Sequence, residues 1–268
     1  MIFGDSDKQS KNPNDLIDFA SIDFNSDLNT NLNIEEKLFG KLNHQELYIM
    51  FEKAGIIRKL KERGYEDCEF ITEFISNLDN RIFIKSKEQE ILIHIRLKFS
   101  DFFIKAIDEN RKMIYIDWLL TQNVKLKKAL HKKKLFPGQE YPGLNIFAEF
   151  TSFIFLLYAE LNCYGVFNIP EYFHDAVLFQ KNFKFVSPEK QGYFLCLLDT
   201  FKNIPIRKIS NLIQENKIYF KEEDEVFIWL HGEMLSTENE QLNESIFNKE
   251  YFEIVKKFQK TLLYIKEV

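Results

Sequence analysis

Two proline–glycine pairs stand within seven residues of each other, in the stretch LFPGQEYPGL at positions 135–144. The whole chain has only 9 Gly and 6 Pro in 268 residues, and its most apolar segment, residues 147–161, follows at once. Backbone N–H groups in a glycine turn, together with the positive N-terminal end of a helix, form a site for phosphate groups. The stretch therefore predicts either a phosphate-binding loop or a tight turn that only starts the helix.

Six lysines precede this loop, within the ten residues KLKKALHKKK at positions 125–134. They are the strongest concentration of positive charge in a chain whose formal net charge is −5. Positive charge beside a phosphate site attracts the anion, which makes Lys134 a candidate contact. The alternative is a solvated loop, because runs of like charge are usually exposed.

Asp117 interrupts an otherwise apolar stretch, MIYIDWLL at positions 113–120, whose pattern predicts a central strand. A carboxylate buried there would have a raised pKa and could act as a general base. Glu140 and Glu149, beside the glycine loop, are alternative bases. Asp117 is equally compatible with an outward-facing position or with capping a neighbouring loop.

His174 lies near the expected start of a helix, in the stretch PEYFHDAV. A helix N-terminus favours the neutral imidazole, which suits a base or a hydrogen-bond donor near pH 7. Tyr172 could then supply an acid. The alternative is a polar first turn in which His174 is hydrogen-bonded to the backbone.

The composition is that of an ordinary globular protein, with 45% hydrophobic and 29% charged residues. The acidic balance argues against general affinity for nucleic acid. The three cysteines, Cys68, Cys163 and Cys196, are far apart and show no metal-binding spacing, so we expect reduced thiols, no metal and a cytoplasmic location. We expect no signal peptide and no membrane span, since the most apolar window is too short and carries two glutamates.

The hydrophobic pattern predicts an α+β protein that begins with an antiparallel meander and continues with alternating helices and strands. In order, we expect a helix at 43–63, strands at 81–85, 91–99 and 113–120, a helix at 145–162, a strand at 165–169, a helix at 172–182, a strand at 183–186, helices at 192–201 and 209–219, a strand at 225–235 and a helix at 251–265.

This order of elements, over residues 47–186, resembles the GNAT acyltransferase superfamily. That family has a loop of the form Gln/Arg-x-x-Gly-x-Gly/Ala before its long helix, and the residues from Gln139 to Gly143 take the corresponding place. A later family pattern, Ala-x-x-Phe/Leu-Tyr-x-x-x-Gly-Phe, is similar to the stretch from Ala176 to Phe185. Gln180 stands where that pattern has its tyrosine.

The resemblance implies a GNAT-like, mostly antiparallel twisted sheet with helices on both faces at residues 35–188. We expect a poorly ordered lead-in at 1–34 and a C-terminal α/β extension at 189–268. The resemblance also implies that acetyl-CoA or another acyl-CoA binds at the loop, and that an amine on a small molecule or a protein attacks the thioester. The implied cofactor contacts are Gly138, Gln139, Gly143, Leu144, Asn145 and Lys134, and the candidate catalytic residues are Asp117, His174 and Tyr172.

Gln180 also favours an alternative, because the tyrosine it replaces commonly protonates the departing CoA thiolate in that family. The alternative is a GNAT-like scaffold without transfer chemistry that senses a ligand or binds a protein, with a possible homodimer interface in the C-terminal extension. An open cleft between the strands that carry Asp117 and Val166 would favour ligand binding, and a filled one would favour the scaffold.

Overall fold

The computed structural model of the chain describes residues 37–76, 78–126, 135 and 139–266. In this part, eight helices surround a seven-stranded sheet, and two further pairs of short strands lie outside it. The predicted α+β class and the mostly antiparallel sheet are confirmed. The expected lead-in at 1–34 lies outside the described residues. No helix in the described part of the chain is both long and apolar enough to cross a bilayer.

The strand order of the sheet is β3-β4-β5-β6-β7-β10-β8, and every neighbouring pair is antiparallel except β6 and β7. The strands are β3 (Glu69–Ser76), β4 (Asp79–Lys85), β5 (Ile91–Ile104), β6 (Glu109–Thr121), β7 (Gly165–Asn168), β10 (Met234–Ser236) and β8 (Lys184–Phe185). The short pairs are β1 (Lys37–Leu38) with β2 (Leu42–Asn43), and β9 (Ile218–Phe220) with β11 (Leu263–Ile265).

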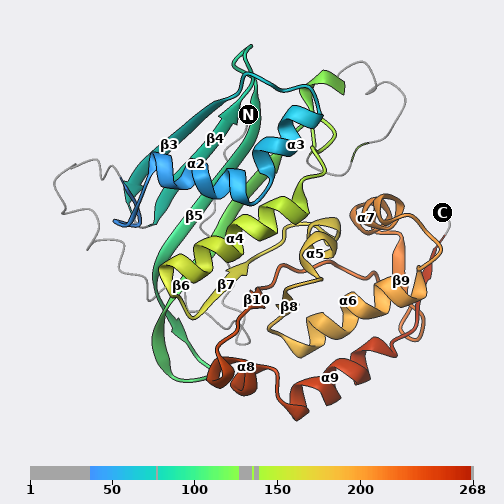
Figure 1. Cartoon of the computed structure of the whole chain (residues 1–268). Coiled ribbons are helices and arrows are strands. Elements are labelled where there is room, and N and C mark those ends of the chain that lie inside the picture. Colours follow the sequence, from blue (N-terminus) through green and yellow to red (C-terminus); the bar gives the residue numbers. More distant parts are fainter. Residues whose placement is uncertain (1–36, 77, 127–134, 136–138, 267–268) are drawn as a thin grey trace.

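The helices are α2 (His44–Lys53), α3 (Ile56–Glu62), α4 (Phe147–Leu161), α5 (Phe173–Phe179), α6 (Pro188–Thr200), α7 (Ile206–Gln214), α8 (Glu240–Ile246) and α9 (Lys249–Gln259). Figure 1 shows α2 and α4 lying together across one face of the meander β3–β6, and α6 beside α9. Phe51 of α2 and Phe153 of α4 meet with ring centroids 4.4 Å apart, which joins the two helices over the sheet.

Alternating residues of the strands face two separate apolar clusters. Val166 and Met234 belong to the main core, which includes buried side chains of α2 and α4. Their strand neighbours Phe167 and Leu235 belong to a smaller cluster with Leu242 of α8. Because successive strand residues point to opposite faces, these clusters lie on opposite sides of the sheet. We call the side with α2 and α4 the helix face, and the other side the far face.

Local patterns predicted the meander and the long helix correctly, with β5, β6 and α4 close to their expected positions. The single helix expected at 43–63 is wrong, because Gly55 adopts φ 86° and divides it into α2 and α3. The strand β3 was not predicted.

The C-terminal part differs more from expectation. The helix expected at 192–201 begins earlier, because Pro188 is the first residue of α6 and Ser187 caps it. The long strand expected at 225–235 is wrong, since only Met234–Ser236 is a strand. The last helix ends at Gln259 and is followed by β11. Because β10 lies between β7 and β8, the C-terminal residues share the central sheet.

Candidate ligand site where β6 leaves β7

The parallel strands β6 and β7 stay together for only four rungs, from Met113 beside Gly165 to Ile116 beside Asn168. β6 then continues to Thr121 against β5. We call the region between residues 117–121 and the chain after Asn168 the fork. Neighbouring strands joined by a crossover helix often bind a ligand at such a place, beyond their carboxyl ends.

A β-bulge marks the point of separation. On β5, Leu97 pairs with Ile116 and Arg96 with Trp118, so that Asp117 is an extra residue on β6. A bulge bends its strand and increases the local twist. The bulge therefore turns residues 117–121 away from the direction shared with β7.

The glycine loop lies against the end of β6. The Asn123 amide donates to the Pro142 carbonyl at 2.7 Å, and a Cβ placed on Gly143 would lie 3.4 Å from Thr121 Oγ1. Leu144 is buried, while Gly143 and Asn145 are exposed and Asn145 adopts φ 52°. The loop is thus anchored by its apolar side chain and turns its backbone outward at the fork.

Helix α4 begins directly after this loop. Its N-cap residue is Ile146, whose apolar side chain cannot accept a hydrogen bond from the amides of the first turn. The first helical hydrogen bond runs from the Phe150 amide to the Ile146 carbonyl at 2.9 Å, which leaves the preceding amides of the first turn outside the helical ladder. Because α4 connects the end of β6 to the start of β7, this first turn lies at the fork end of the sheet. An uncapped N-terminus there favours an anion.

Positive side chains come from the C-cap of α3 and from the turn after β6. Arg63 Nη2 lies 3.5 Å from the Asn145 carbonyl, and its buried Nε has no hydrogen-bond partner among the described residues. Lys125 donates to the Gly64 carbonyl and lies 4.5 Å from the centre of the Tyr65 ring. The predicted contacts Lys134 and Gly138 lie outside the described residues, and Gln139 is partly exposed.

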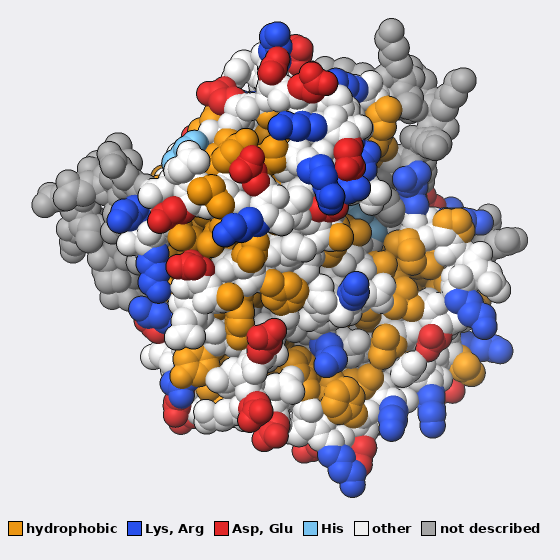
Figure 2. All heavy atoms as spheres, in the orientation of Figure 1, with side chains coloured by type: hydrophobic (Ala, Val, Ile, Leu, Met, Phe, Trp, Pro, Cys, Tyr) orange, Lys and Arg blue, Asp and Glu red, His pale blue; other side chains and the backbone are white. Residues whose placement is uncertain are grey.

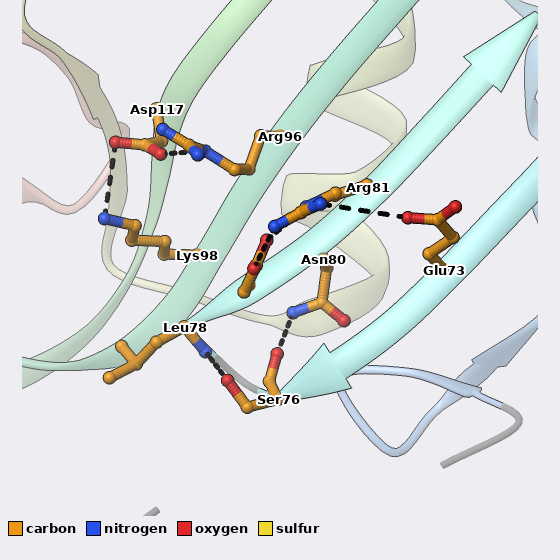
Figure 3. A network of polar contacts seen from close by, with 9 residues as sticks. Glu73, Ser76, Leu78, Asn80, Arg81, Arg96, Lys98 and Asp117 are labelled. Carbon is orange, nitrogen blue, oxygen red and sulfur yellow. Dashed lines mark hydrogen bonds and ion pairs between the residues drawn. The ribbon is translucent and has the colours of Figure 1, made fainter. Parts of the chain in front are cut away.

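Asp117 is engaged on the far face (Figure 3). Its carboxylate forms an ion pair with Arg96 and another, at 3.3 Å, with Lys98, and only 10% of the side chain is exposed. Burial is the main cause that raises the pKa of Tyr115, and the charge of Asp117 and a hydrogen bond to it raise it further. The carboxylate thus holds three neighbouring side chains around the bulge.

The same face carries a second polar group on the outer strands of the meander. Arg81 binds Asp79 through two nitrogens, at 2.6 and 2.8 Å, and lies 4.0 Å from Glu73. Figure 3 shows this group beside the Asp117 cluster on the adjacent strands. Figure 2 shows the helix-face side of the molecule, where Lys, Arg, Asp and Glu side chains are scattered among apolar ones.

His174 is buried, and its Nδ1 lies 2.9 Å from Ser210 Oγ on α7. Burial lowers the pKa of His174 to about 4, so the ring is neutral at pH 7. Its Nε2 lies 3.4 Å from Asp175, and burial raises the pKa of that carboxyl to about 6. Tyr172 is the N-cap residue of α5, and its ring stacks on His174 with centroids 5.5 Å apart. This group joins α5 to α7.

The predicted residues therefore fall in three places. Gly143, Leu144 and Asn145 form the loop at the fork. Asp117 contacts β5 on the far face, and His174 contacts α7. Of the alternative bases, Glu140 is exposed, and Glu149 packs beside Gly55, where an added Cβ would lie 3.5 Å from the Glu149 Cγ.

Two residues at the fork were not predicted, Arg63 and Asn168. Asn168 ends β7 and is 3% exposed, with a buried Oδ1 that has no hydrogen-bond partner in the described part of the chain. Its signal in the sequence is a polar residue in the apolar run GVFNIP. Arg63 gives no such signal, because basic residues are common at helix ends.

Two cavities accompany α2 and α3, and neither is lined by residues of the glycine loop. One, of about 360 Å³, is lined by Glu52, Ile57, Arg58, Lys61 and Glu62. The second, of about 110 Å³, shares Ile57 and Lys61 with it and reaches Cys68, whose thiol pKa is raised by burial. A thiol of raised pKa is a poor nucleophile, so this cavity offers no reactive group of that kind.

Among the described residues, no group of three or more His, Cys, Asp or Glu side chains could hold a metal ion. Neither a protein-family model nor a curated protein matches the chain.

Proposed function

We propose that this protein is a GNAT-like acyltransferase that binds acyl-CoA at the fork and transfers the acyl group to an amine. The observation that carries the proposal is the presence of three features along the last residues of β6. The parallel strands separate at the Asp117 bulge, the glycine loop lies against Thr121 at the end of β6, and α4 starts directly after that loop without a side-chain cap.

The fit of an acyl-CoA rests on charge and on hydrogen bonding. Uncapped amides of α4 and the guanidinium of Arg63 suit a pyrophosphate or a phosphate. The orphaned Oδ1 of Asn168 suits a polar group between the strands. Acyl-CoA would supply the thioester that the amine attacks, and Asp117 remains a predicted base.

A second candidate is a ligand-binding scaffold without transfer chemistry. The two predicted bases are already engaged, Asp117 with two cations and His174 with Ser210. A base that is held by structural partners has to exchange them before it can accept a proton. This observation favours binding over catalysis.

The test is calorimetric titration of the full chain with acetyl-CoA, in the wild type and in Gly143→Val. We expect micromolar binding by the wild type, because anion sites at uncapped helix starts are preformed. We expect at least tenfold weaker binding by Gly143→Val, whose branched side chain would crowd Thr121 and the outward-facing backbone. Gly143→Ala is the matched control, since its Cβ makes only an ordinary contact.

Absence of binding by folded wild-type protein would overturn the proposal. If acetyl-CoA binds, release of free CoA is measured with a panel of small amines and lysine peptides. Amine-dependent release supports transfer. Binding without release for any amine supports the scaffold.

A further inference from the structure

Asn168 occupies the last rung of the parallel pair, beside Ile116 of β6 and Met234 of β10. It shares the helix face with Val166, two residues earlier on the same strand. Ile116 and Met234 are buried and apolar. The carboxamide therefore ends a strand between apolar neighbours, at the point where the fork opens.

Two other buried asparagines have partners for their side-chain amides. Asn123 Oδ1 accepts from the Tyr65 hydroxyl at 2.9 Å, and Asn80 Nδ2 donates to the Ser76 carbonyl. Asn168, which is as buried as Asn80, differs because its Oδ1 is shielded from solvent and finds no donor in the described residues. Native proteins rarely leave such an atom unpaired, and those that remain need an explanation, often a ligand or an ordered water.

The chemistry of the missing partner follows from the side chain. A carboxamide oxygen accepts one or two hydrogen bonds, and its nitrogen donates two. Rotation of the amide by 180° exchanges the two atoms, so the shielded position is orphaned as an acceptor or as a donor. A secondary amide in the ligand satisfies either arrangement, because it offers an N–H and a C=O. A phosphate would satisfy only a donor.

We propose that Asn168 is the residue that recognises the amide-bearing arm of the ligand at the fork, while the glycine loop and α4 hold its phosphates. The inference rests on the proposed function and deepens it, since it separates two parts of the site. The arm is recognised by a side chain of β7 whose Oδ1 has no hydrogen-bond partner among the described residues, and the nucleotide end is recognised by backbone groups of the glycine loop and α4.

The experiment uses two probes on the full chain, acetyl-CoA and adenosine 3′,5′-bisphosphate, which has the phosphates but lacks the arm. For the wild type, we expect acetyl-CoA to bind at least tenfold more tightly than the bisphosphate. For Asn168→Leu, which keeps the branched shape without the polar atoms, we expect about tenfold weaker binding of acetyl-CoA, the usual effect of one lost hydrogen bond to a buried group. The affinity for the bisphosphate should not change.

Thermal unfolding of the ligand-free protein gives an independent readout. Replacing an orphaned polar atom by an apolar group removes a desolvation cost, so the melting temperature of Asn168→Leu should equal or exceed that of the wild type. Asn80→Leu is the matched control, and it should melt several degrees lower because it leaves the Ser76 carbonyl without its donor. Asn168→Ala is the second variant, in case the larger leucine overpacks the site.

Each outcome decides between the two proposals. If the wild type binds the two probes equally, or if both Asn168 variants keep the wild-type affinity for acetyl-CoA, the inference is wrong while the proposed function stands. A fall of several degrees in the melting temperature of both Asn168 variants also overturns it, because Asn168 then has a structural partner. If folded wild type binds neither probe, the proposed function fails and the inference fails with it.

Discussion

Asp117 of β6 follows directly on Ile116, the partner of Asn168 at the end of β7, yet the two polar side chains lie on opposite faces of the sheet. On the far face, the Asp117 carboxylate is held by Arg96 and Lys98. On the helix face, the Asn168 oxygen has no partner in the described residues. The comparison separates two uses of a buried polar group, one that holds the bulge in place and one that is left for a ligand. Substitutions of Asp117 should therefore reduce stability, and those of Asn168 should reduce binding.

The largest effect on stability is expected for Asp117→Ala. The variant leaves two partly buried cations without their carboxylate and removes the acceptor of Tyr115, so we expect a loss of about 2–3 kcal/mol in the free energy of unfolding. Chemical denaturation measures it. The control is Glu73→Ala on the same face, whose 4.0 Å contact and 48% exposure predict a loss of at most about 0.5 kcal/mol.

Equal stability of Asp117→Ala and the wild type would contradict the structural role of this carboxylate. It would also strengthen the prediction that Asp117 is a catalytic base, because the carboxylate would then not be needed for the fold. Asp117→Asn tests the charge alone, because the amide keeps one acceptor for Tyr115 and loses the ion pairs. We expect its loss to be smaller than that of the alanine variant.

The next prediction concerns how the free energy of unfolding depends on pH. It tests the group of His174, Ser210 and Asp175 that joins α5 to α7. Burial lowers the pKa of His174 to about 4, so between pH 6.5 and 4 the unfolded chain binds a proton that the folded protein does not, and His174 destabilises the fold as pH falls. Burial raises the pKa of Asp175 to about 6, so between pH 6 and 4 the folded protein binds the extra proton, and Asp175 stabilises the fold as pH falls. The two slopes oppose each other.

Single variants should reveal each slope in urea denaturation between pH 4 and 7. Asp175→Asn should lose about 2 kcal/mol of unfolding free energy more than the wild type over this fall in pH, because only the His174 slope remains. His174→Asn should lose less than the wild type, because only the Asp175 slope remains. This difference should be at least as large as that of Asp175→Asn, since 5% of the His174 side chain is exposed but about a third of the Asp175 side chain. Parallel profiles for all three proteins would show that neither group titrates as proposed.

Much of the fold could be predicted from local periodicity. The alternation of apolar and polar residues at 91–99 reflects a strand with one buried face, and the apolar run at 147–161 reflects a buried helix. Both patterns lie within a single element, so β5 and α4 were predicted correctly. The strand predicted at 225–235 is wrong because some apolar residues of this segment are buried and others are exposed. Phe227 is buried and Trp229 packs on Phe173, whereas Ile228 and Leu230 are 59% and 62% exposed in an irregular segment.

The site was only half predictable for a related reason. The glycine loop is a local signal, so Gly143 and Asn145 were placed correctly at the start of α4. The fork depends on the register of β7 with β6 and on the insertion of β10 beside β7, which pair residues about 50 to 70 positions apart. The contacts of Asp117 and Asn168 depend on which strands lie beside β6 and β7. The sequence of either strand alone therefore does not predict these contacts.

The smallest effect is expected for Arg63, which tests whether the helix face binds the anion through a side chain as well as through backbone groups. Its guanidinium already lies at the Asn145 carbonyl and has an unpaired Nε, so it can turn toward a phosphate without losing a structural ion pair. We expect Arg63→Ala to weaken binding of adenosine 3′,5′-bisphosphate about fivefold, with less than about 0.5 kcal/mol lost in stability. Lys61→Ala, an exposed lysine in the last turn of α3, just before Arg63, is the control. The contribution of an ion pair to binding decreases as salt is added. The difference in bisphosphate affinity between Arg63→Ala and the wild type should therefore be smaller at 300 mM than at 50 mM NaCl. A difference that does not depend on salt would mean that Arg63 supports the loop and does not bind the phosphate.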